Sequence, residues 1–348
     1  SDGSWKQLIL APGTFVSIPF QTLVTEDPAR AISSQGTDFR AVKWLGTRQA
    51  ITVIPSIAGF KALRSAARPS TATEPFLGFG NPLLDGTLGN ARHAKLAVEA
   101  KELQRCPRLE VVAEAGEARG SVASLAFGGL ADLVQLKRQI PLPETAVELC
   151  DVARSFGLPD TVIDSNIRLG AKATETEIKA LNSNNRLANY RVLHFATHGA
   201  LAGQVQGSAE PGLILTPPNE ATAADDGYLT ASEIAQLKLN ADWIILSACN
   251  TAGGGSDDVS GLAGLARAFF YAGARAILVS HWAVNSKATV KLITSAFGKL
   301  KKNSQLGRAE VMRLAMSELI AKGESYETHP AFWAPFSVVG EGGAAQTP

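Results

Sequence analysis

Short apolar segments alternate with amphipathic ones along most of the chain. Segments of four to eight mostly apolar or β-branched residues, bounded by Gly, Pro or Asn, predict strands. They cover residues 8–11, 51–54, 76–80, 167–169, 190–197, 211–216, 243–248, 276–279 and 333–339. Residues 243–248 are nearly all apolar, which is typical of a strand buried on both faces, whereas residues 211–216 suggest an edge hairpin strand.

The segments between these strands predict helices. Residues 144–156 carry apolar side chains at helical spacing and are followed by Gly157, the usual C-terminal residue of a helix. Thr174 with Glu177, and Thr230 with Glu233, have the spacing of capping boxes. Further helices are expected at residues 94–103, at 260–271 and, as a pair, between 279 and 333. This alternation requires crossover connections, and it therefore predicts an α/β fold with a mostly parallel sheet covered on both faces.

Two regions interrupt the pattern. Residues 85–138 mix helical pieces with a short apolar segment at 109–113 that is a strand candidate. Residues 66–74 are rich in Ser, Thr, Pro and Ala, and they predict a boundary between an N-terminal subdomain (1–72) and a larger domain (73–348). A length of 348 residues agrees with about two domains.

Composition excludes several classes of protein. With 45% hydrophobic and 19% charged residues, the chain has the make-up of a globular protein rather than a disordered or fibrous one. A net charge of +1 gives no electrostatic attraction to nucleic acid or to an anionic membrane. No apolar run reaches the roughly 18 residues that span a bilayer, and no signal peptide is evident. The first methionine is Met312, which suggests a piece of a longer protein.

Cysteine usage favours a reducing compartment. Cys106, Cys150 and Cys249 are few, odd in number and scattered, which is unlike the cysteine pattern of a disulfide framework. We therefore expect a cytoplasmic protein with at least one free thiol.

Reactive side chains follow two of the predicted strands. Residues 190–197 lead into His198 and Gly199, and residues 243–248 lead into Cys249. If the two strands are neighbours in a parallel sheet, their carboxyl ends lie about 5 Å apart. A thiol with an ordinary pKa near 8.5 needs an imidazole or a helix N-terminus nearby to ionise at neutral pH. The backbone N–H groups of Gly199 and Cys249 are then candidates for an oxyanion site.

Simpler interpretations exist for each of these residues. A cysteine beside an apolar strand is commonly a buried structural residue, and a histidine after a strand is commonly a hydrogen-bonded loop residue. The matched positions of His198 and Cys249 favour catalysis. His194 lies four residues before His198, about 13 Å away on a strand, so the two cannot share a metal ion, and we expect no metal or cofactor. The glycines 253–255 lack the Lys of a phosphate-binding loop, and no Gly-x-Ser-x-Gly serine-hydrolase motif occurs.

Several motifs together resemble the CHAT domain, a relative of caspases, separases and gingipains. They are residues 192–199 (VLHFATHG), 226–230 (DGYLT), 246–252 (LSACNTA), 332–336 (FWAPF) and 8–12 (LILAP). The resemblance implies a caspase-like three-layer sandwich in which 76–80 is the first strand of the catalytic domain and 144–156 its first helix. It implies a bacterial thiol endopeptidase with His198 as general base and Cys249 as nucleophile. It also implies a TPR-type regulatory region or partner, and no cofactor.

The expected pocket for the substrate side chain departs from the family. The resemblance implies an acidic pair shortly after a Trp, but here Trp282 is followed by Ala283, Val284, Asn285 and Ser286. An amide cannot neutralise Arg or Lys, so basic selectivity would require Asp257 or Asp258, which otherwise belong to a solvated loop. Trp282 is expected in the pocket wall or core, and His281 is expected to be exposed. This departure leaves a catalytically silent CHAT-fold interaction module, or another acyl-transfer enzyme, as alternatives.

Overall fold

The computed structural model describes residues 7–10, 18–28, 38–54, 70–107, 129–247, 259–282 and 284–343. Its main sheet has eight strands in the order β1-β2-β11-β10-β9-β5-β3-β4, and every neighbouring pair is parallel except β10 with β11. The strands are β1 (Gln7–Leu10), β2 (Ala50–Val53), β3 (Glu74–Gly80), β4 (Ile167–Leu169), β5 (Tyr190–Ala196), β9 (Trp243–Leu246), β10 (Ala276–Ser280) and β11 (Phe336–Gly340).

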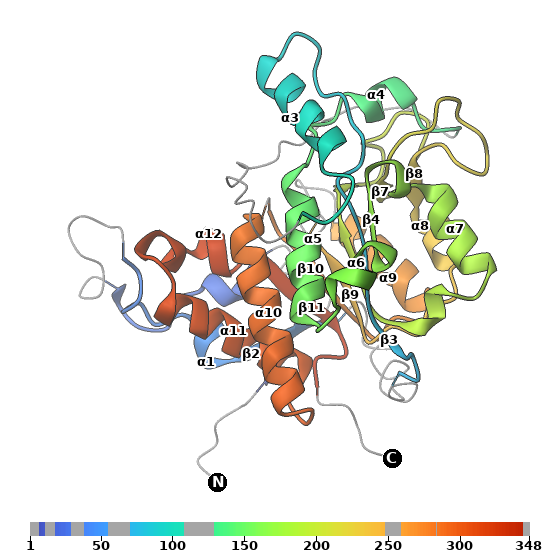
Figure 1. The fold of residues 1–348 in the computed structure, drawn as a ribbon. Coiled ribbons are helices and arrows are strands. Elements are labelled where there is room, and N and C mark those ends of the chain that lie inside the picture. Colours follow the sequence, from blue (N-terminus) through green and yellow to red (C-terminus); the bar gives the residue numbers. More distant parts are fainter. Residues whose placement is uncertain are drawn as a thin grey trace.

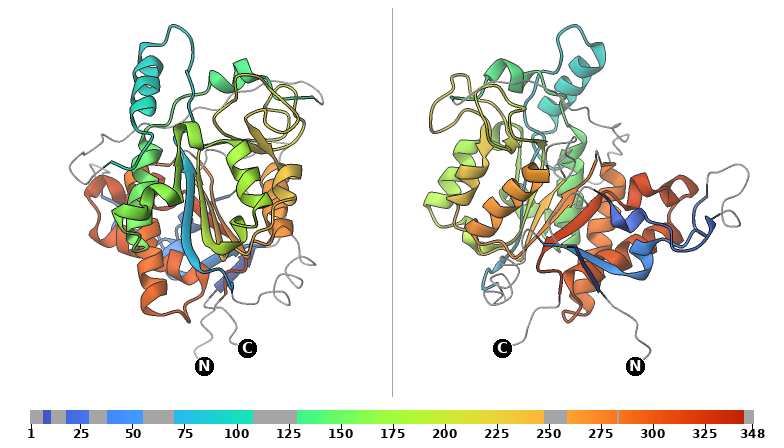
Figure 2. Two further views of the ribbon diagram at one scale, coloured as in Figure 1. Left: turned by 45° about the vertical axis from the view of Figure 1, so that its right-hand side comes forward. Right: turned by 180° about the vertical axis from the view of Figure 1, so that it is seen from behind.

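Helices cover both faces of this sheet (Figures 1 and 2). One face carries α5 (Glu144–Ser155), α6 (Asp160–Asn166), α10 (Ser286–Lys302), α11 (Arg308–Lys322) and α12 (Pro330–Trp333). The other carries α7 (Glu175–Ser183), α8 (Ala231–Ala235) and α9 (Val259–Ala272). Shorter or outlying helices are α1 (Leu45–Arg48), α3 (Ala91–Glu102) and α4 (Leu133–Lys137). The predicted α/β three-layer sandwich with a mostly parallel sheet is confirmed.

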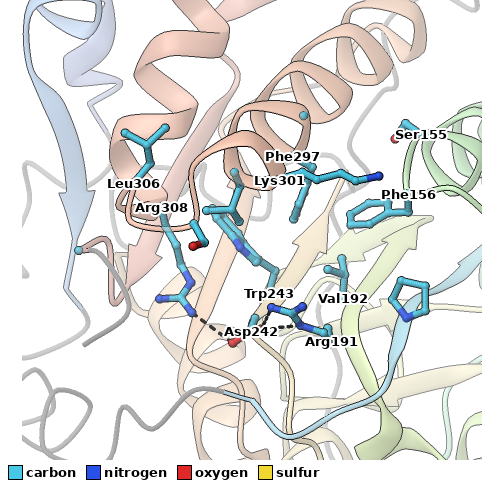
Figure 3. A pocket seen from close by; sticks show the side chains of 15 residues that line it. Ser155, Phe156, Arg191, Val192, Asp242, Trp243, Phe297, Lys301, Leu306 and Arg308 are labelled. Atoms are coloured by element: carbon cyan, nitrogen blue, oxygen red, sulfur yellow. Dashed lines mark hydrogen bonds and ion pairs between the residues drawn. The ribbon is translucent and has the colours of Figure 1, made fainter. Parts of the chain in front are cut away.

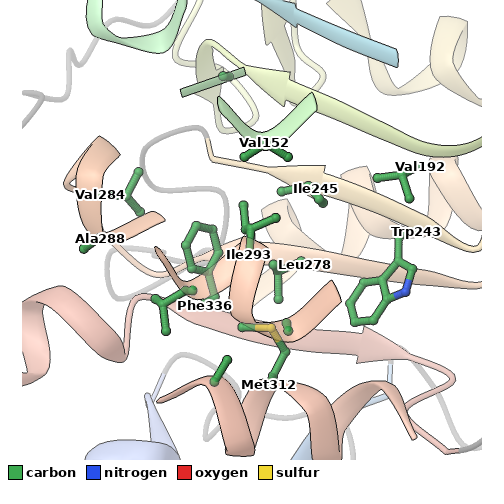
Figure 4. Packing of buried hydrophobic residues seen from close by; sticks show 14 of the residues in the cluster. Val152, Val192, Trp243, Ile245, Leu278, Val284, Ala288, Ile293, Met312 and Phe336 are labelled. Atoms are coloured by element: carbon green, nitrogen blue, oxygen red, sulfur yellow. The ribbon is translucent and has the colours of Figure 1, made fainter. Parts of the chain in front are cut away.

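The sheet separates the hydrophobic core into two layers, one on each face. Along β5, Val192 packs with the α5–α10 side and Leu193 with the α7–α9 side, because successive side chains of a strand point to opposite faces. Figure 4 shows the first side, where Ile293 of α10 and Met312 of α11 lie near Leu278 and Phe336 of the sheet. Burial on both faces explains why these strands are almost wholly apolar.

Three of the sequence-based expectations differ from the structure. The predicted strand at 333–339 begins only at Phe336, since Trp333 closes α12 and donates its indole N–H to the carbonyl of Thr328 at 2.8 Å. The expected edge strand at 211–216 is β7 (Gly212–Ile214), which lies between β6 (His198–Ala200) and β8 (Tyr228–Thr230) in a separate three-stranded sheet. Thr174 caps α7, but Glu177 pairs with Arg168 at 2.6 Å instead of completing the box. The box of Thr230 and Glu233 is confirmed.

A disulfide joins Cys106 to Cys150, so the argument from the cysteine count against disulfides is wrong for this pair. The two residues are separated by 44 positions in sequence, but the segment after α3 returns to α5 and brings their Cα atoms to 5.6 Å. The fold brings the two cysteines together although they are far apart in the sequence. Cys249 is the remaining cysteine of the chain.

The N-terminal segment contributes to the main sheet. β2 pairs with β11, and β1 pairs with β2 at the sheet edge. The strand expected at 109–113 lies outside the described residues, and the boundary at residue 72 stays a prediction. Within the described residues, no helix is long and apolar enough to cross a membrane.

Candidate active site

The two strands that precede His198 and Cys249 are neighbours. β5 and β9 pair in parallel with Phe195 opposite Leu246, and the N–H of Ser247 donates to the carbonyl of Phe195 at 3.2 Å. The carboxyl ends of β5 and β9 therefore lie side by side, as predicted. Cys249, two residues beyond Ser247, lies outside the described residues.

His198 is held at this end of β5 by a backbone carbonyl. Its imidazole is buried, and its Nε2 lies 2.7 Å from the carbonyl oxygen of Ile140, in the connection between α4 and α5. A carbonyl oxygen can only accept, so Nε2 carries the hydrogen of this bond. In the neutral ring Nδ1 is then the basic nitrogen, which is the form that a general base requires.

The small sheet fixes the backbone on both sides of His198. Thr197 donates its hydroxyl to the carbonyl of Ile214, and His198 lies opposite Ile214 in the pairing of β6 with β7. Gly199 is half-buried in the same strand. Because its neighbours on both sides are tied to β7, the position of Gly199 is set by the small sheet.

The Asp226-Gly227 pair anchors the loop that enters β8. Glu175, at the start of α7, accepts the N–H groups of Asp226 and Gly227 at 3.1 and 3.2 Å. Asp226 in turn accepts the N–H of Ala131 at 2.8 Å. Gly227 has φ +81°, and an added Cβ would lie 2.7 Å from the Cα of Pro217, so only glycine fits this turn. This motif is therefore a structural support of the small sheet.

Ser247, two residues before Cys249 in the sequence, belongs to a buried polar network. The hydroxyl of Ser247 donates to Oε1 of Glu148 at 2.6 Å, and Nε2 of His194 lies 2.9 Å from that hydroxyl and 3.1 Å from the same carboxylate oxygen. All three side chains have an exposed fraction of 0%. Since the single hydroxyl hydrogen goes to Glu148, His194 must donate from Nε2. The network ties α5 to both strands, and it supports the predicted structural role of His194.

Glu148 and Ile140 are the two contributors that sequence reasoning missed. The sequence holds a signal for Glu148, because the apolar Val152 lies four residues after it and therefore shares its face of the predicted helix 144–156. A carboxylate on the apolar face of a helix needs a buried partner. Ile140 gives no such signal, since it acts through its backbone carbonyl, which every residue possesses.

The residues expected in the substrate pocket are only partly described. Trp282 is half-buried and donates its indole N–H to the carbonyl of Ala331 at 3.1 Å. Asn285 is the N-cap of α10, and its Oδ1 accepts the N–H of Ala288 at 3.0 Å. Asp257 and Asp258 lie outside the described residues. A pocket role for these four residues stays a prediction.

His281 is buried, and the expectation that it is exposed is wrong. Its exposed fraction is 7%, and its Nε2 lies 2.7 Å from the hydroxyl of Ser337 on β11. The pairing of β10 with β11 continues past Ser280, where the N–H of His281 donates to the carbonyl of Pro335, and this holds His281 beside β11. Burial lowers the pKa of His281 from 6.5 to about 4, so the ring is neutral at pH 7.

This shift predicts acid sensitivity. The unfolded chain takes up the proton near pH 6.5 and the folded chain only near pH 4, so the contribution of His281 is complete above pH 6.5 and is lost as the pH falls toward 4. We expect the free energy of unfolding, measured by urea denaturation, to fall about 2 kcal/mol less between pH 7 and pH 5 in His281→Gln than in the wild type. His93→Gln, at a half-buried histidine of α3, serves as control and should follow the wild type. Equal pH dependence in all three proteins would contradict the assignment.

Within the described residues, no group of three His, Cys, Asp or Glu side chains could hold a metal ion.

Comparisons with known proteins give a family and several distant likenesses. The model of the CHAT domain family matches residues 1–341. Tetratricopeptide repeat protein 28 of Mus musculus is 26% identical over 234 residues, which cover 58% of this chain and 9% of that protein. This chain therefore corresponds to a small part of that relative.

Two solved structures align with most of the chain. The complex of Porphyromonas gingivalis RgpB pro- and mature domains has a TM-score of 0.37 and 12% identity, covering 98% of this chain and 79% of that chain. The Arg specific cysteine proteinase gingipain R has a TM-score of 0.37 and 11% identity, covering 99% and 79%.

Proposed function

The chain belongs to the CHAT domain family, and from this premise we propose that it is a caspase-like cysteine endopeptidase with His198 and Cys249 as its catalytic dyad. The observation that carries the proposal is the setting of His198. Its buried imidazole is oriented by the carbonyl of Ile140 at the end of β5, beside the strand that leads to Cys249. Catalytic dyads need a base whose tautomer is fixed by a third group.

In the proposed reaction, Nδ1 of His198 accepts the proton of the Cys249 thiol. The thiolate attacks the carbonyl carbon of the scissile peptide bond, and the backbone N–H groups of Gly199 and Cys249 stabilise the oxyanion. The C–N bond then breaks as the imidazolium protonates the leaving amine, which leaves a thioester on Cys249. Attack by water, with His198 again accepting the proton, releases the acid and restores the thiol.

Regulation by a TPR-containing region is part of the proposal. The support is the similarity to a TPR protein, of which this chain matches only a small part. The capping role of Asn285 supports a pocket without fixed basic selectivity, because its side-chain oxygen is already bonded to α10 and its amide carries no charge. The same feature makes a silent interaction module the second candidate.

Labelling with peptidyl acyloxymethyl ketones tests the activity. These probes alkylate an activated cysteine, and a series with varied residues at the position before the cleaved bond also reports selectivity. We expect the wild type to be labelled by probes with uncharged side chains as well as basic ones, Cys249→Ala not at all, and His198→Ala about 10²–10⁴ times more slowly. His93→Ala, a histidine on the outlying α3, should label at the wild-type rate.

Circular dichroism confirms that each variant is folded. Absence of labelling in a folded wild type across the whole series, with and without a TPR partner, would favour the interaction module. Labelling by basic probes alone would show that an acidic residue elsewhere serves the pocket.

A further inference from the structure

A cavity of about 430 Å³ opens at the amino ends of β5 and β9, whereas His198 lies at the carboxyl end of β5. Its floor is made near the starts of β5 and β9, by Arg191 and Val192 of β5, by Asp242 just before β9, and by Trp243. The end of α5, the last turns of α10 and the start of α11 form its walls (Figure 3). This volume lies in the usual range of small-molecule sites, about 300–1,000 Å³.

One wall of the cavity is aromatic. The rings of Phe156 and Phe297 have centroids 4.5 Å apart, and those of Trp243 and Phe297 lie 5.6 Å apart. Leu300 and Leu306 extend this surface. Phe156 and Phe297 are only half-buried, so ring surface remains open to a flat apolar group.

The other side of the cavity has an excess of positive charge. Arg191 and Arg308 converge on Asp242, at 3.0 and 3.4 Å, and Arg275 approaches the same carboxylate at 3.9 Å from behind. Lys301 also lines the cavity, and Glu341 is a second acidic group near Arg308. Among the charged residues that line the cavity, three are cations (Arg191, Lys301 and Arg308) and one, Asp242, is an anion.

Arg308 is a mostly buried cation in the lining of the cavity. Its side chain is 10% exposed, and its Cζ lies 5.9 Å from the centroid of the Trp243 ring. Burial lowers the pKa of Arg308, Asp242 opposes the shift, and Arg275 and Arg191 add to it. An anion beside Arg308 would relieve this crowding of like charges.

We propose that this cavity binds a small amphipathic organic anion, with an aromatic body against Phe156, Trp243 and Phe297 and a carboxylate, sulfonate or phosphate group beside Arg308, Arg191 and Lys301. The proposal is independent of the peptidase activity, because the site lies at the other end of the strands. It adds a ligand site to the fold.

Two matched fluorescent probes test it on the whole chain. Anilinonaphthalene sulfonate carries the anion, and N-phenyl-1-naphthylamine has the same rings without it. We expect saturable binding of one sulfonate probe per chain, at least about tenfold tighter than binding of the neutral probe. Lys301→Ala and Arg191→Ala should each weaken sulfonate binding several-fold and leave the neutral probe unchanged, while Lys302→Ala, an exposed neighbour outside the lining, should change neither.

A variant that adds a side chain at the cavity lining provides a second test of the ligand site. Gly298 lines the cavity, and a Cβ added there meets nothing within 4 Å, so Gly298→Leu is accommodated by α10 and projects into open space. This variant should weaken both probes at least about tenfold while its circular dichroism stays native. Equal affinity for the two probes, or sulfonate binding that survives Gly298→Leu, would overturn the proposal.

Discussion

Replacing Glu148 with alanine is expected to lower the free energy of unfolding by about 3–5 kcal/mol. The carboxylate accepts hydrogen bonds from Ser247 and His194, and all three side chains are excluded from solvent. Its removal leaves the hydroxyl of Ser247 buried without its acceptor, leaves the N–H of His194 with the Ser247 oxygen alone, and opens a void between α5 and the sheet. Urea denaturation followed by circular dichroism measures the loss.

Two further variants separate the network from the general effect of removing an acid. Glu148→Gln keeps the volume and one acceptor oxygen, and it should cost about 1–3 kcal/mol. Asp151→Ala removes an acid of the same helix that is 38% exposed, and its partner Arg154 keeps Asp160 at 3.1 Å. That control should cost less than about 1 kcal/mol. A similar loss for Glu148→Ala and Asp151→Ala would show that the network contributes nothing.

Replacing Asp242 with alanine is expected to cost a similar 3–5 kcal/mol for a different reason. The carboxylate is 12% exposed and lies among three guanidinium groups, two of which, on Arg275 and Arg308, are themselves 15% and 10% exposed. Without it, like charges face one another in a poorly solvated region. The loss is again measured by urea denaturation.

A second-site change tests this explanation of the Asp242 effect. Arg308→Met in the Asp242→Ala background removes the most buried of the three cations and puts an apolar side chain in place of the guanidinium near the Trp243 ring, so it should restore about 1–3 kcal/mol. In the wild-type background the same change should not stabilise the protein. Additive losses in the double variant would mean that the two side chains do not interact energetically.

Much of the fold was predictable because burial on both faces leaves a simple signature. Strands such as β9 and β10 are short and almost wholly apolar, with several β-branched residues, and β5 is largely apolar as well. The signature is ambiguous for aromatic residues beside proline. Trp333 is as buried as any strand residue, but it belongs to a helical turn whose packing depends on Thr328.

The site was predictable only where a residue type implies its chemistry. His198 was found because a histidine after a buried strand is conspicuous. The adjacency of β5 and β9 was a condition of the prediction, and the structure meets it. The partner of His198 could not be found in this way, since Ile140 contributes a carbonyl. The Cys106–Cys150 disulfide and the three-arginine cluster depend on contacts between segments distant in sequence, for which a single chain carries no local signal.

The position of β11 has a consequence for how the chain is made. This strand, formed by residues 336–340, lies between β10 and β2, and among the strands that the structure describes β2 has β11 on one side and β1 on the other. A ribosome releases the N-terminal end of a chain first, at about 5–20 residues per second. On a nascent chain, β1 and β2 therefore have no place in the sheet until nearly all of the remaining strands have emerged. β1 and β2 are thus made before the other strands of this sheet, and although they can pair with each other they are among the last to join it. Until then the backbone N–H and C=O groups that β2 presents to β11 have no strand partner.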